Sequence, residues 1–414
     1  MRIAFVAETL GCPIYLGGIS RYTYVLGLAL TELGHEVHVY TMATPEEWQR
    51  EIGLDCPLRF HHVRRYAPSL FGYRTLYYRL LRECWPGYCF VNEWAVPLVI
   101  DLVRDARRGL LDIIEAPETG GRIAIGTKLL TRYVPVVGRL HSPSFITAQG
   151  SYAADSLRLK QVTRMEAMFA RNATAISAPS RAVADLVRRR FGVLGDIRVI
   201  GNPVPRPTTE TFDIRGLTEK RVVFVGRFEP LKGFDTLLRA MPKIQMRVPD
   251  VIFDLIGPDL FNAFEHGTES GLRVYMTADE AKAVAPRIRI HGELLPEQAD
   301  EIRARATCAV VPSTFESFSF TLTEAMALGR PVVASRAGAL LEIVEHGRSG
   351  LLVEVGADEA LAAAVTELLL DPEKAHSMGR EARIAMETRF APSVIAARME
   401  DFYATVCATV KSEQ

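Results

Sequence analysis

The sequence lacks the features that mark several large classes of protein. Its six cysteines are scattered over 414 residues, with no CxxC pair and no Cys/His cluster at zinc spacing. This argues against a disulfide framework and a structural zinc site. No segment approaches the roughly 18 uninterrupted apolar residues of a membrane-spanning helix, and "MRIAFVAETLGC" has no apolar core of signal-peptide length. We expect a reduced, cytoplasmic protein that is at most peripheral on the inner face of a membrane.

An excess of charge of one sign is also missing. Lys plus Arg and Asp plus Glu number 49 each, so no overall field recruits nucleic acid, and we expect no nucleic-acid partner. The dinucleotide fingerprint GxGxxG is absent from the N-terminal glycine loop, which removes the main support for a nicotinamide or flavin cofactor. We therefore expect no such cofactor.

Short apolar runs alternate with segments of helical periodicity, the pattern of a parallel sheet with covering helices. "RIAFVA", a helix over residues 18–33 and "EVHVYT" give a βαβ opening, and the same order restarts at "KRVVFVGR". Between them, the proline-rich residues 201–217 read as a connector. The sequence therefore predicts two α/β domains and a hinge, with ligands at the carboxyl ends of the strands.

One predicted strand-to-helix loop of the second half carries two cations, Arg227 and Lys232, in "VVFVGRFEPLKGFDTLL". Two cations beside a helix start are suited to a diphosphate. The competing interpretation is that both are solvated loop charges.

The stretch "PSTFESFSFTLTEAMALGRPVV" offers a second anion-binding loop. A helix that begins near residue 319 directs the N–H groups of its first turn at an anion. These are the N–H groups of Ser319, Phe320 and Thr321. Glu316 lies ahead of the helix and Glu324 about one turn into it, so the two acids could bracket a nucleotide sugar. Alternatively, both are solvated helix charges.

The first half offers weaker candidates. Gly17 and Gly18 precede a helix, where backbone can approach a ligand closely, or they form a plain turn. His141 ends the strand of "VPVVGRLHSPS" and is directed toward the cleft, or it is structural. Glu115 and Glu118 end another strand, where they either face an acceptor or act as capping groups.

Residues 61–85 combine five arginines with six aromatic residues. Such a helical stretch could lie on an anionic membrane or hold a lipid-linked acceptor. It could equally pack its rings into the domain with the arginines outside.

Taken together, these segments resemble the retaining nucleotide-sugar glycosyltransferases of family 4, the "group 1" set. "FVGRFEPLKGFDTLLRA", "ESFSFTLTEAMALGRPVVAS" and "AGALLEIVEHGRSGLLVEVGADEALAAAV" carry the resemblance, and "GGISRY", "IEAPE" and "RLHSPS" extend it. It implies an α/β GT-B fold of two Rossmann-like domains facing each other across a cleft. Residues 1–203 would bind the acceptor and residues 204–388 the nucleotide sugar, with a C-terminal helix, 389–414, packing back on the first domain.

The resemblance also implies a reaction and residue roles. A sugar would move with retained configuration from a nucleotide-diphosphate sugar, UDP being favoured, to a glycan, lipid-linked or small-molecule acceptor. No metal would take part, and the leaving phosphate would help to accept the proton in a front-face attack.

By this resemblance, Arg227 and Lys232 contact the diphosphate, Glu324 the ribose and Glu316 the transferred sugar. His141 lies near the anomeric carbon, and Gly17 with Gly18 meets the phosphate or acceptor. The family usually has glycine where this chain has Ser319, so a positive φ there would strain the serine. The competing functions are a nucleotide-sugar epimerase, a phosphorylase of the same fold, and a non-catalytic nucleotide-sugar-binding subunit.

Overall fold

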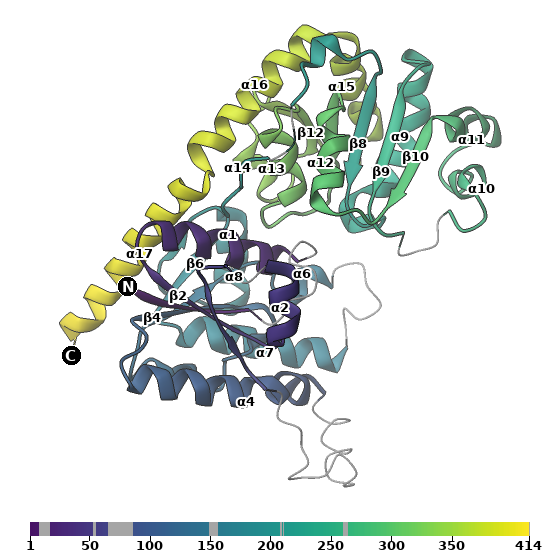
Figure 1. Cartoon of the computed structure of the whole chain (residues 1–414). Helices are drawn as coiled ribbons and strands as arrows, with labels where there is room; N and C mark the ends of the chain where they lie inside the picture. The colour runs from purple at the N-terminus through teal and green to yellow at the C-terminus, as the bar shows by residue number, and fades with distance from the viewer. Residues whose placement is uncertain are drawn as a thin grey trace. The chain divides into compact units, whose positions relative to one another are not determined.

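The computed structural model (Figure 1) describes residues 1–7, 17–52, 55–64, 86–148, 156–207, 209, 211–259 and 264–413. The chain divides into two compact units. Unit 1 comprises Met1–Pro203 and Pro392–Gln414, and unit 2 comprises Val204–Ala391. The chain thus passes from one unit to the other twice.

Unit 1 is built on a parallel sheet in the order β3-β2-β1-β4-β5-β6-β7. Its strands are β1 (Arg2–Val6), β2 (Glu36–Thr41), β3 (Arg59–His62), β4 (Ile113–Pro117), β5 (Val136–Arg139), β6 (Ala175–Ala178) and β7 (Ile197–Val199). Its helices are α1 (Gly18–Glu32), α2 (Pro45–Ile52), α4 (Pro86–Arg107), α5 (Thr127–Leu130), α6 (Ser144–Thr147), α7 (Leu157–Asn172), α8 (Arg181–Phe191) and α17 (Pro392–Glu413), and η2 (Thr119–Gly121) is a 3-10 turn. Buried side chains of β1, β4, α4 and α7 form one core beneath the sheet.

A buried carboxylate ties two helices of unit 1 to its sheet. Glu115 of β4 accepts hydrogen bonds of 2.8 Å from the hydroxyls of Tyr22 on α1 and Tyr403 on α17. Burial raises the pKa of Glu115, while the charge of nearby Arg139 opposes the rise. The C-terminal helix is therefore anchored at the centre of the unit 1 sheet.

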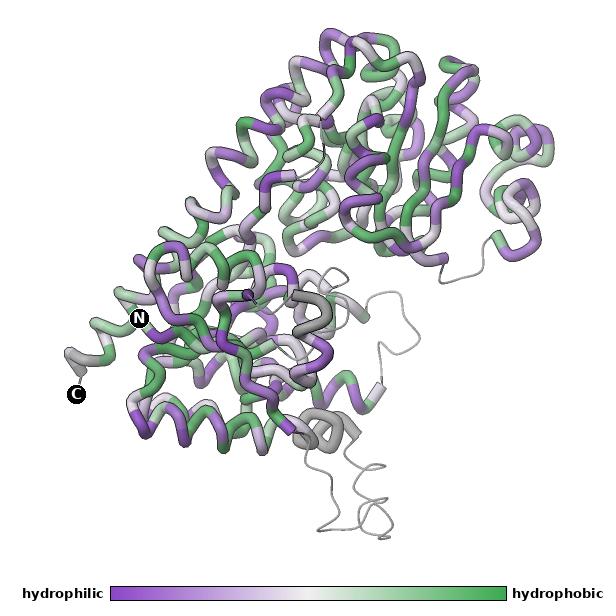
Figure 2. The backbone as a smooth tube through the Cα atoms, viewed as in Figure 1, coloured by the Kyte–Doolittle hydropathy of each residue, from purple (hydrophilic) through white to green (hydrophobic). Residues whose placement is uncertain are grey.

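Unit 2 repeats the arrangement with the strand order β10-β9-β8-β11-β12-β13. Its strands are β8 (Arg221–Val225), β9 (Ile252–Ile256), β10 (Ile288–Gly292), β11 (Cys308–Val311), β12 (Val332–Ser335) and β13 (Gly350–Val353). Its helices are α9 (Phe234–Arg247), α10 (Thr268–Leu272), α11 (Ala278–Val284), α12 (Pro296–Ala304), α13 (Phe320–Ala327), α14 (Leu340–Ile343), α15 (Asp358–Leu370) and α16 (Pro372–Arg389), with 3-10 turns η3 (Ile214–Gly216), η4 (Pro230–Lys232) and η5 (Ala285–Arg287). Apart from the edge strand β10, whose residues are partly or fully exposed, the strands are largely apolar along their length (Figure 2), as expected of sheets covered on both faces.

The predicted α/β class with two parallel sheets is confirmed. The C-terminal tail differs in detail, because it forms two helices, α16 in unit 2 and α17 in unit 1. The break falls at residues 390–391, just after the boundary of 389 taken from the sequence.

The segment 61–85 is only partly described. Residues 61 and 62 end strand β3, so the helix expected for this segment does not include them. Residues 65–85, and with them the predicted membrane contact, lie outside the described residues. Within the described part of the chain, no helix is long and apolar enough to cross a membrane.

Candidate functional site

The carboxyl ends of two neighbouring strands in unit 2 bring Lys232 and Glu316 together. Lys232 follows β8 and Glu316 follows β11, which pairs with β8 in parallel. The Lys232 ammonium donates a hydrogen bond of 2.8 Å to Oε1 of Glu316. Lys232 is about a quarter exposed whereas Glu316 is buried. The ammonium is therefore open to an anionic ligand, and the carboxylate fixes its position.

Close backbone packing sets the positions of these two loops. Gly233 has φ +65°, and a Cβ built on it would lie 1.8 Å from the carbonyl oxygen of Pro312. Gly338, at φ +50°, would place a Cβ 2.3 Å from the carbonyl oxygen of Glu316. No side chain fits at either position, so Gly233 is needed for the loops after β8 and β11 to meet, and Gly338 for the loop after β12 to pack on Glu316.

Two further hydrogen bonds hold Glu316. The hydroxyl of Ser313 donates to Oε1 at 2.8 Å, and the amide of Ala339 donates to the Glu316 carbonyl oxygen at 2.9 Å. Oε1 therefore accepts from both a hydroxyl and an ammonium group. A carboxylate held in this way is suited to orient a polar ligand rather than to move toward a reacting carbon.

The helix expected near residue 319 is α13, which begins at Phe320, next to Thr321. Ser319 precedes it with φ 77° and ψ 87°, the only positive φ of a non-glycine residue among those described. The strain foreseen for a serine at this position is thus present. The Ser319 hydroxyl lies 3.3 Å from that of Thr321, and the side chain does not cap the helix.

Glu324 is buried on α13 and forms an ion pair with Arg303 of α12, with 2.6 Å between Nη2 and Oε2. Arg303 is itself buried and also contacts Asp300 at 2.6 Å. This arginine was not predicted. Its signal in the sequence is weak, because an Arg three residues after an Asp is ordinary on an exposed helix.

Arg227 is about half exposed, and it contacts Glu229 of its own loop at 2.6 Å. The pairing leaves it outside the Lys232–Glu316 contact. An exposed arginine with a single flexible partner can turn toward an anion at little cost, since such surface pairs contribute only about 0–1 kcal/mol.

In unit 1, His141 follows β5 and is buried. Its backbone N–H donates a hydrogen bond of 2.8 Å to Oε2 of Glu118, which follows the adjacent strand β4. The ring of Tyr22 meets the imidazole edge-on, with 5.0 Å between the ring centroids. Burial, with a contribution from the charge of Arg139, holds the pKa of His141 well below its usual value. The imidazole is therefore neutral at pH 7.

A second buried carboxylate, Glu166 of α7, binds the same loops. It accepts hydrogen bonds from the amide of Gly120 at 2.9 Å and from the hydroxyl of Ser144 at 2.5 Å. Burial raises the pKa of Glu166. Burial and the proximity of Glu166 raise the pKa of Glu118 to about 8, and no described residue hydrogen-bonds to its Oε1. Glu166, which accepts hydrogen bonds from two backbone amides and a hydroxyl, is thus suited to carry the charge and Glu118 the proton.

Glu166 was also missed by the sequence reasoning, although a signal exists. It lies on the buried stripe of α7 with Val162, Met165 and Phe169. A glutamate within such an i, i+3, i+4, i+7 stripe requires internal donors. The capping interpretation of Glu118 is close to the structure, since its carboxylate does bind a backbone amide.

Gly17 and Gly18 are exposed at the start of α1. Gly17 has φ −119° and ψ 127°, and among the described residues a Cβ there would meet only Ser20, at 3.5 Å. This extended conformation is open to any residue, so it does not require glycine at Gly17. A bare backbone at a helix start is what a close-lying ligand would use.

The candidate residues thus fall into two groups. Unit 2 holds Arg227, Lys232, Glu316, Ser319, Phe320, Thr321 and Glu324, and unit 1 holds Gly17, Gly18 and His141. Contacts among them join Lys232 to Glu316 and Ser319 to Thr321, whereas Arg227 and Glu324 pair with residues outside the predicted set. In the described parts of the chain, no group of three or more metal-ligating side chains lies together.

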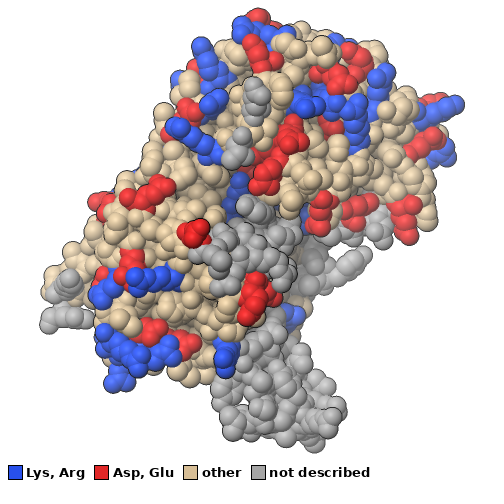
Figure 3. Space-filling view, in the orientation of Figure 1, with Lys and Arg blue, Asp and Glu red and all other residues tan. Residues whose placement is uncertain are grey.

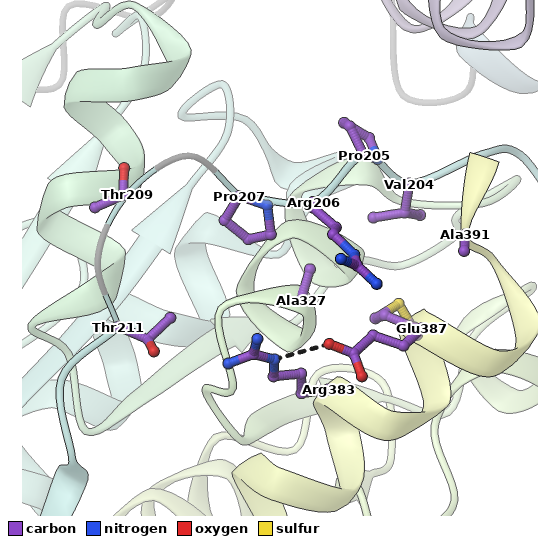
Figure 4. A pocket seen from close by; sticks show the side chains of 11 residues that line it. Val204, Pro205, Arg206, Pro207, Thr209, Thr211, Ala327, Arg383, Glu387 and Ala391 are labelled. Carbon is purple, nitrogen blue, oxygen red and sulfur yellow. Dashed lines mark hydrogen bonds and ion pairs between the residues drawn. The ribbon is translucent and has the colours of Figure 1, made fainter. Parts of the chain in front are cut away.

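A separate cavity of about 290 Å³ in unit 2 contains none of these residues. It lies between the part of the connector that begins at Val204, the end of α13 and helix α16 (Figure 4). Arg383 and Glu387 of α16 pair with each other along its wall, 3.0 Å apart. The connector residues that line it therefore share this cavity with α16 and not with the candidate site.

Comparisons with known proteins match both halves of the chain. The family model described as Glycosyl transferases group 1 matches residues 209–385, and that described as Glycosyltransferase Family 4 matches residues 16–206. The D-inositol 3-phosphate glycosyltransferase of Pseudarthrobacter chlorophenolicus is 33% identical over 408 residues, which cover 94% of this chain and 91% of that protein.

Two solved structures are similar over nearly their whole length. The sucrose-phosphate synthase from Thermosynechococcus elongatus has a TM-score of 0.72 and 25% identity and covers 99% of each chain. Anabaena Alr3699/HepE in complex with UDP-glucose has a TM-score of 0.66 and 20% identity, with coverage of 98% of this chain and 100% of that chain.

Proposed function

This chain belongs to the group 1 glycosyl transferases, with a Family 4 first half and the GT-B fold, and on that premise we propose that it moves a sugar from UDP to an acceptor hydroxyl with retained configuration. The acceptor is a glycan, a lipid-linked molecule or a small molecule. The complex of Alr3699/HepE with UDP-glucose supports the choice of UDP. A cytoplasmic location fits the scattered cysteines.

The observation that carries the proposal is the contact between Lys232 and Glu316 at the ends of β8 and β11. In an open α/β sheet, ligands bind at the carboxyl ends of the strands. Lys232 and Arg227 supply positive charge for the diphosphate, and the start of α13, with the N–H groups of residues 319–321, adds the positive end of a helix dipole. This charge would stabilise the leaving diphosphate without a metal ion.

Glu316 is assigned to orient the transferred sugar through its hydroxyls. A double displacement would need a free carboxylate at the anomeric carbon. The hydrogen bonds from Lys232 and Ser313 to Oε1 fix the orientation of Glu316, and we favour front-face attack, in which the leaving phosphate oxygen accepts the proton of the acceptor hydroxyl.

The remaining roles follow the same chemistry. Glu324, held by Arg303, would bind the ribose hydroxyls. His141, as a neutral imidazole, would hydrogen-bond the sugar near the anomeric carbon without adding charge. Gly17 and Gly18 would let the start of α1 approach the phosphate or the acceptor.

A thermal-shift panel tests the donor and the metal dependence. UDP, GDP, ADP and their common sugar conjugates are compared with EDTA and then with magnesium. We expect a UDP-selective shift that EDTA leaves unchanged and that Lys232→Ala abolishes. A shift that appears only with magnesium would overturn metal independence, and no shift with any nucleotide would overturn the donor site.

The stereochemistry is tested on the product. With the donor that produces the shift, proton NMR of the new linkage should give the anomeric configuration of the donor. Release of an epimerised sugar from the donor alone, or turnover that needs phosphate, would contradict the transferase assignment and favour an epimerase or a phosphorylase.

A further inference from the structure

Exposed apolar side chains of the described residues are concentrated on one part of unit 1. Six of the 18 large hydrophobic residues with exposed side chains fall within residues 96–133, on α4 and on the segment around α5. These six are Val96, Ile100, Leu110, Ile125, Leu129 and Tyr133. Ile100 and Ile125 are each more than half exposed. Single exposed apolar residues are ordinary, but a cluster marks an interaction surface.

The parts of this cluster on α4 and around α5 meet. A Cβ built on Gly126 would lie 2.4 Å from the side chain of Val99, so the backbone beside Ile125 presses directly against α4. Ile100 and Leu129 line one shallow groove of about 570 Å³ between the two segments. We call this surface the α4/α5 face and define it by residues 96–108 and 125–133.

The opposite side of α4 is the buried one. Trp94, Leu98 and Leu102 point into the core of unit 1, whereas Val96 and Ile100 are exposed. The exposed apolar positions of α4 therefore do not complete the core of their own domain. They are available to another surface.

The α4/α5 face is also basic. Its exposed cations are Arg104, Arg107, Arg108, Lys128 and Arg132. Arg104 is paired with Asp101 and Asp105, and Arg107 lies 5.8 Å from the ring of Tyr133. Among the described residues, no carboxylate pairs with the other cations. Lys and Arg side chains gather over the end of α4 in Figure 3.

We propose that the α4/α5 face docks unit 1 on the surface of an anionic lipid bilayer. Ile100, Ile125 and Leu129 would enter the boundary between headgroups and acyl chains, and the cations around them would contact lipid phosphates. Aliphatic residues ringed by Lys and Arg, with an aromatic ring at the edge, have the composition of membrane-surface segments. Each cation close to an anionic leaflet adds about 1 kcal/mol.

The charge of the face argues against a second copy of the chain as the occupant. A two-fold interface brings the same patch of both subunits together. The unpaired cations of one copy would then face those of the other, because the carboxylates of the face, Asp101 and Asp105, are already paired with Arg104. Single-stranded nucleic acid is also a poor fit, because its bases stack on aromatic rings, and the centre of this face is aliphatic.

This inference goes beyond the proposed function and is independent of the donor and of turnover. It assigns membrane contact to described residues of α4 and α5, apart from the segment 65–85. A bilayer on this face would hold the enzyme at the surface where a lipid-linked acceptor resides.

Vesicle co-sedimentation of the full chain provides the test. Vesicles of phosphatidylcholine alone are compared with vesicles that also contain phosphatidylglycerol. We expect at least tenfold stronger binding to the anionic vesicles, and a loss of that preference in high salt because screening weakens the attraction.

Matched variants locate the contact. The pair Lys128→Gln and Arg132→Gln should lower binding by roughly fivefold per cation removed, and Ile100→Ser with Ile125→Ser should lower it at least as much. Met246→Ser and Arg206→Gln, which change exposed residues of unit 2, should leave it unchanged. Circular dichroism of each variant shows whether it is folded.

Three results would overturn the proposal. The first is a folded wild-type chain that does not bind anionic vesicles, and the second is binding that the α4/α5 variants leave intact. The third is a dimer in sedimentation velocity that Ile100→Ser dissociates, which would make a second copy the occupant. None of these results depends on glycosyl transfer, so the proposed function is tested separately.

Discussion

Lys232 and Glu316 hold each other at 2.8 Å across the ends of two adjacent parallel strands. They are 84 residues apart in the sequence. The pair positions the ammonium of Lys232 at the edge of the sheet, where it is partly exposed and can donate further hydrogen bonds to a ligand. The cation is therefore already oriented before an anion binds.

Lys232→Met should remove the charge while keeping most of the apolar stem. We expect kcat/KM to fall about 10²- to 10³-fold, the usual effect of losing one group that stabilises charge in the transition state. Steady-state kinetics with the donor from the thermal-shift panel measure it. Lys220→Met is the control, since Lys220 is an exposed cation paired with Asp250. Unchanged kinetics in Lys232→Met would refute the assigned role.

Gly233→Ala should disrupt the meeting of the β8 and β11 loops. The new Cβ would fall 1.8 Å from the Pro312 carbonyl oxygen, and the positive φ adds about 1 kcal/mol of strain. We expect a loss of stability of about 3 kcal/mol or more, together with loss of the nucleotide-induced thermal shift. Urea unfolding of unit 2 provides the measurement.

Two other glycines allow the effect of the steric clash on stability to be distinguished from the effect of the positive φ. Gly347 has φ +80° but open space around it, and Gly216 has open space without a positive φ. We expect Gly347→Ala to cost about 1 kcal/mol and Gly216→Ala to cost nothing or to stabilise slightly. Equal losses for Gly233→Ala and Gly347→Ala would show that the contact with Pro312 does not constrain the loop.

The fold could be predicted from the sequence because its signals are local. Apolar runs such as "RIAFV" and "CAVV" are strands buried on both faces, and parallel strands require crossover helices. The start of α13 could be predicted for the same reason. The partner of each charged residue could not, because Arg303 reaches Glu324 and Glu166 reaches Ser144 only after distant elements pack together.

The C-terminal tail, which forms α16 and α17, also depends on a contact that the sequence does not predict. Helical periodicity over the last residues is readable, and Pro392 at the first position of α17 signals the break at residues 390–391, because proline is tolerated at a helix start but not in its interior. The unit on which α17 docks is not readable. Docking of α17 depends on Tyr403 reaching Glu115. A tyrosine on a helix gives no indication in sequence of which sheet its hydroxyl will find.

Ser319→Gly should stabilise unit 2, because glycine adopts φ 77° without the cost that a side chain brings. The greater freedom of glycine in the unfolded chain lowers this gain by about 1 kcal/mol at most. Ser319→Val should lose about 1–2 kcal/mol, since a β-branched residue is an outlier at positive φ. Urea unfolding measures the free energy of unfolding of both variants. Equal values would mean that residue 319 relaxes to another backbone conformation.

Glu118 makes the stability of unit 1 depend on pH. Its pKa in the folded chain is raised to about 8 by burial and by Glu166, above the value of about 4.3 expected when it is unfolded. Between these values the unfolded chain has released the proton and the folded chain has not. The contribution of Glu118 is therefore fully present below about pH 4 and is lost as pH rises through 8, by at most about 1.4 kcal/mol per pH unit.

Glu118→Gln isolates this contribution, because the amide is neutral at every pH and can still accept from the His141 amide. We expect the variant to gain stability relative to the wild type as pH rises from 5 to 8, and the difference to level off above pH 8. Urea unfolding of both proteins at several pH values measures the difference, in which the titration of His141 cancels. If the stabilities of the two proteins change with pH in the same way across that range, Glu118 is ionised in the folded protein. Glu166 would then not be a neighbouring negative charge that raises its pKa.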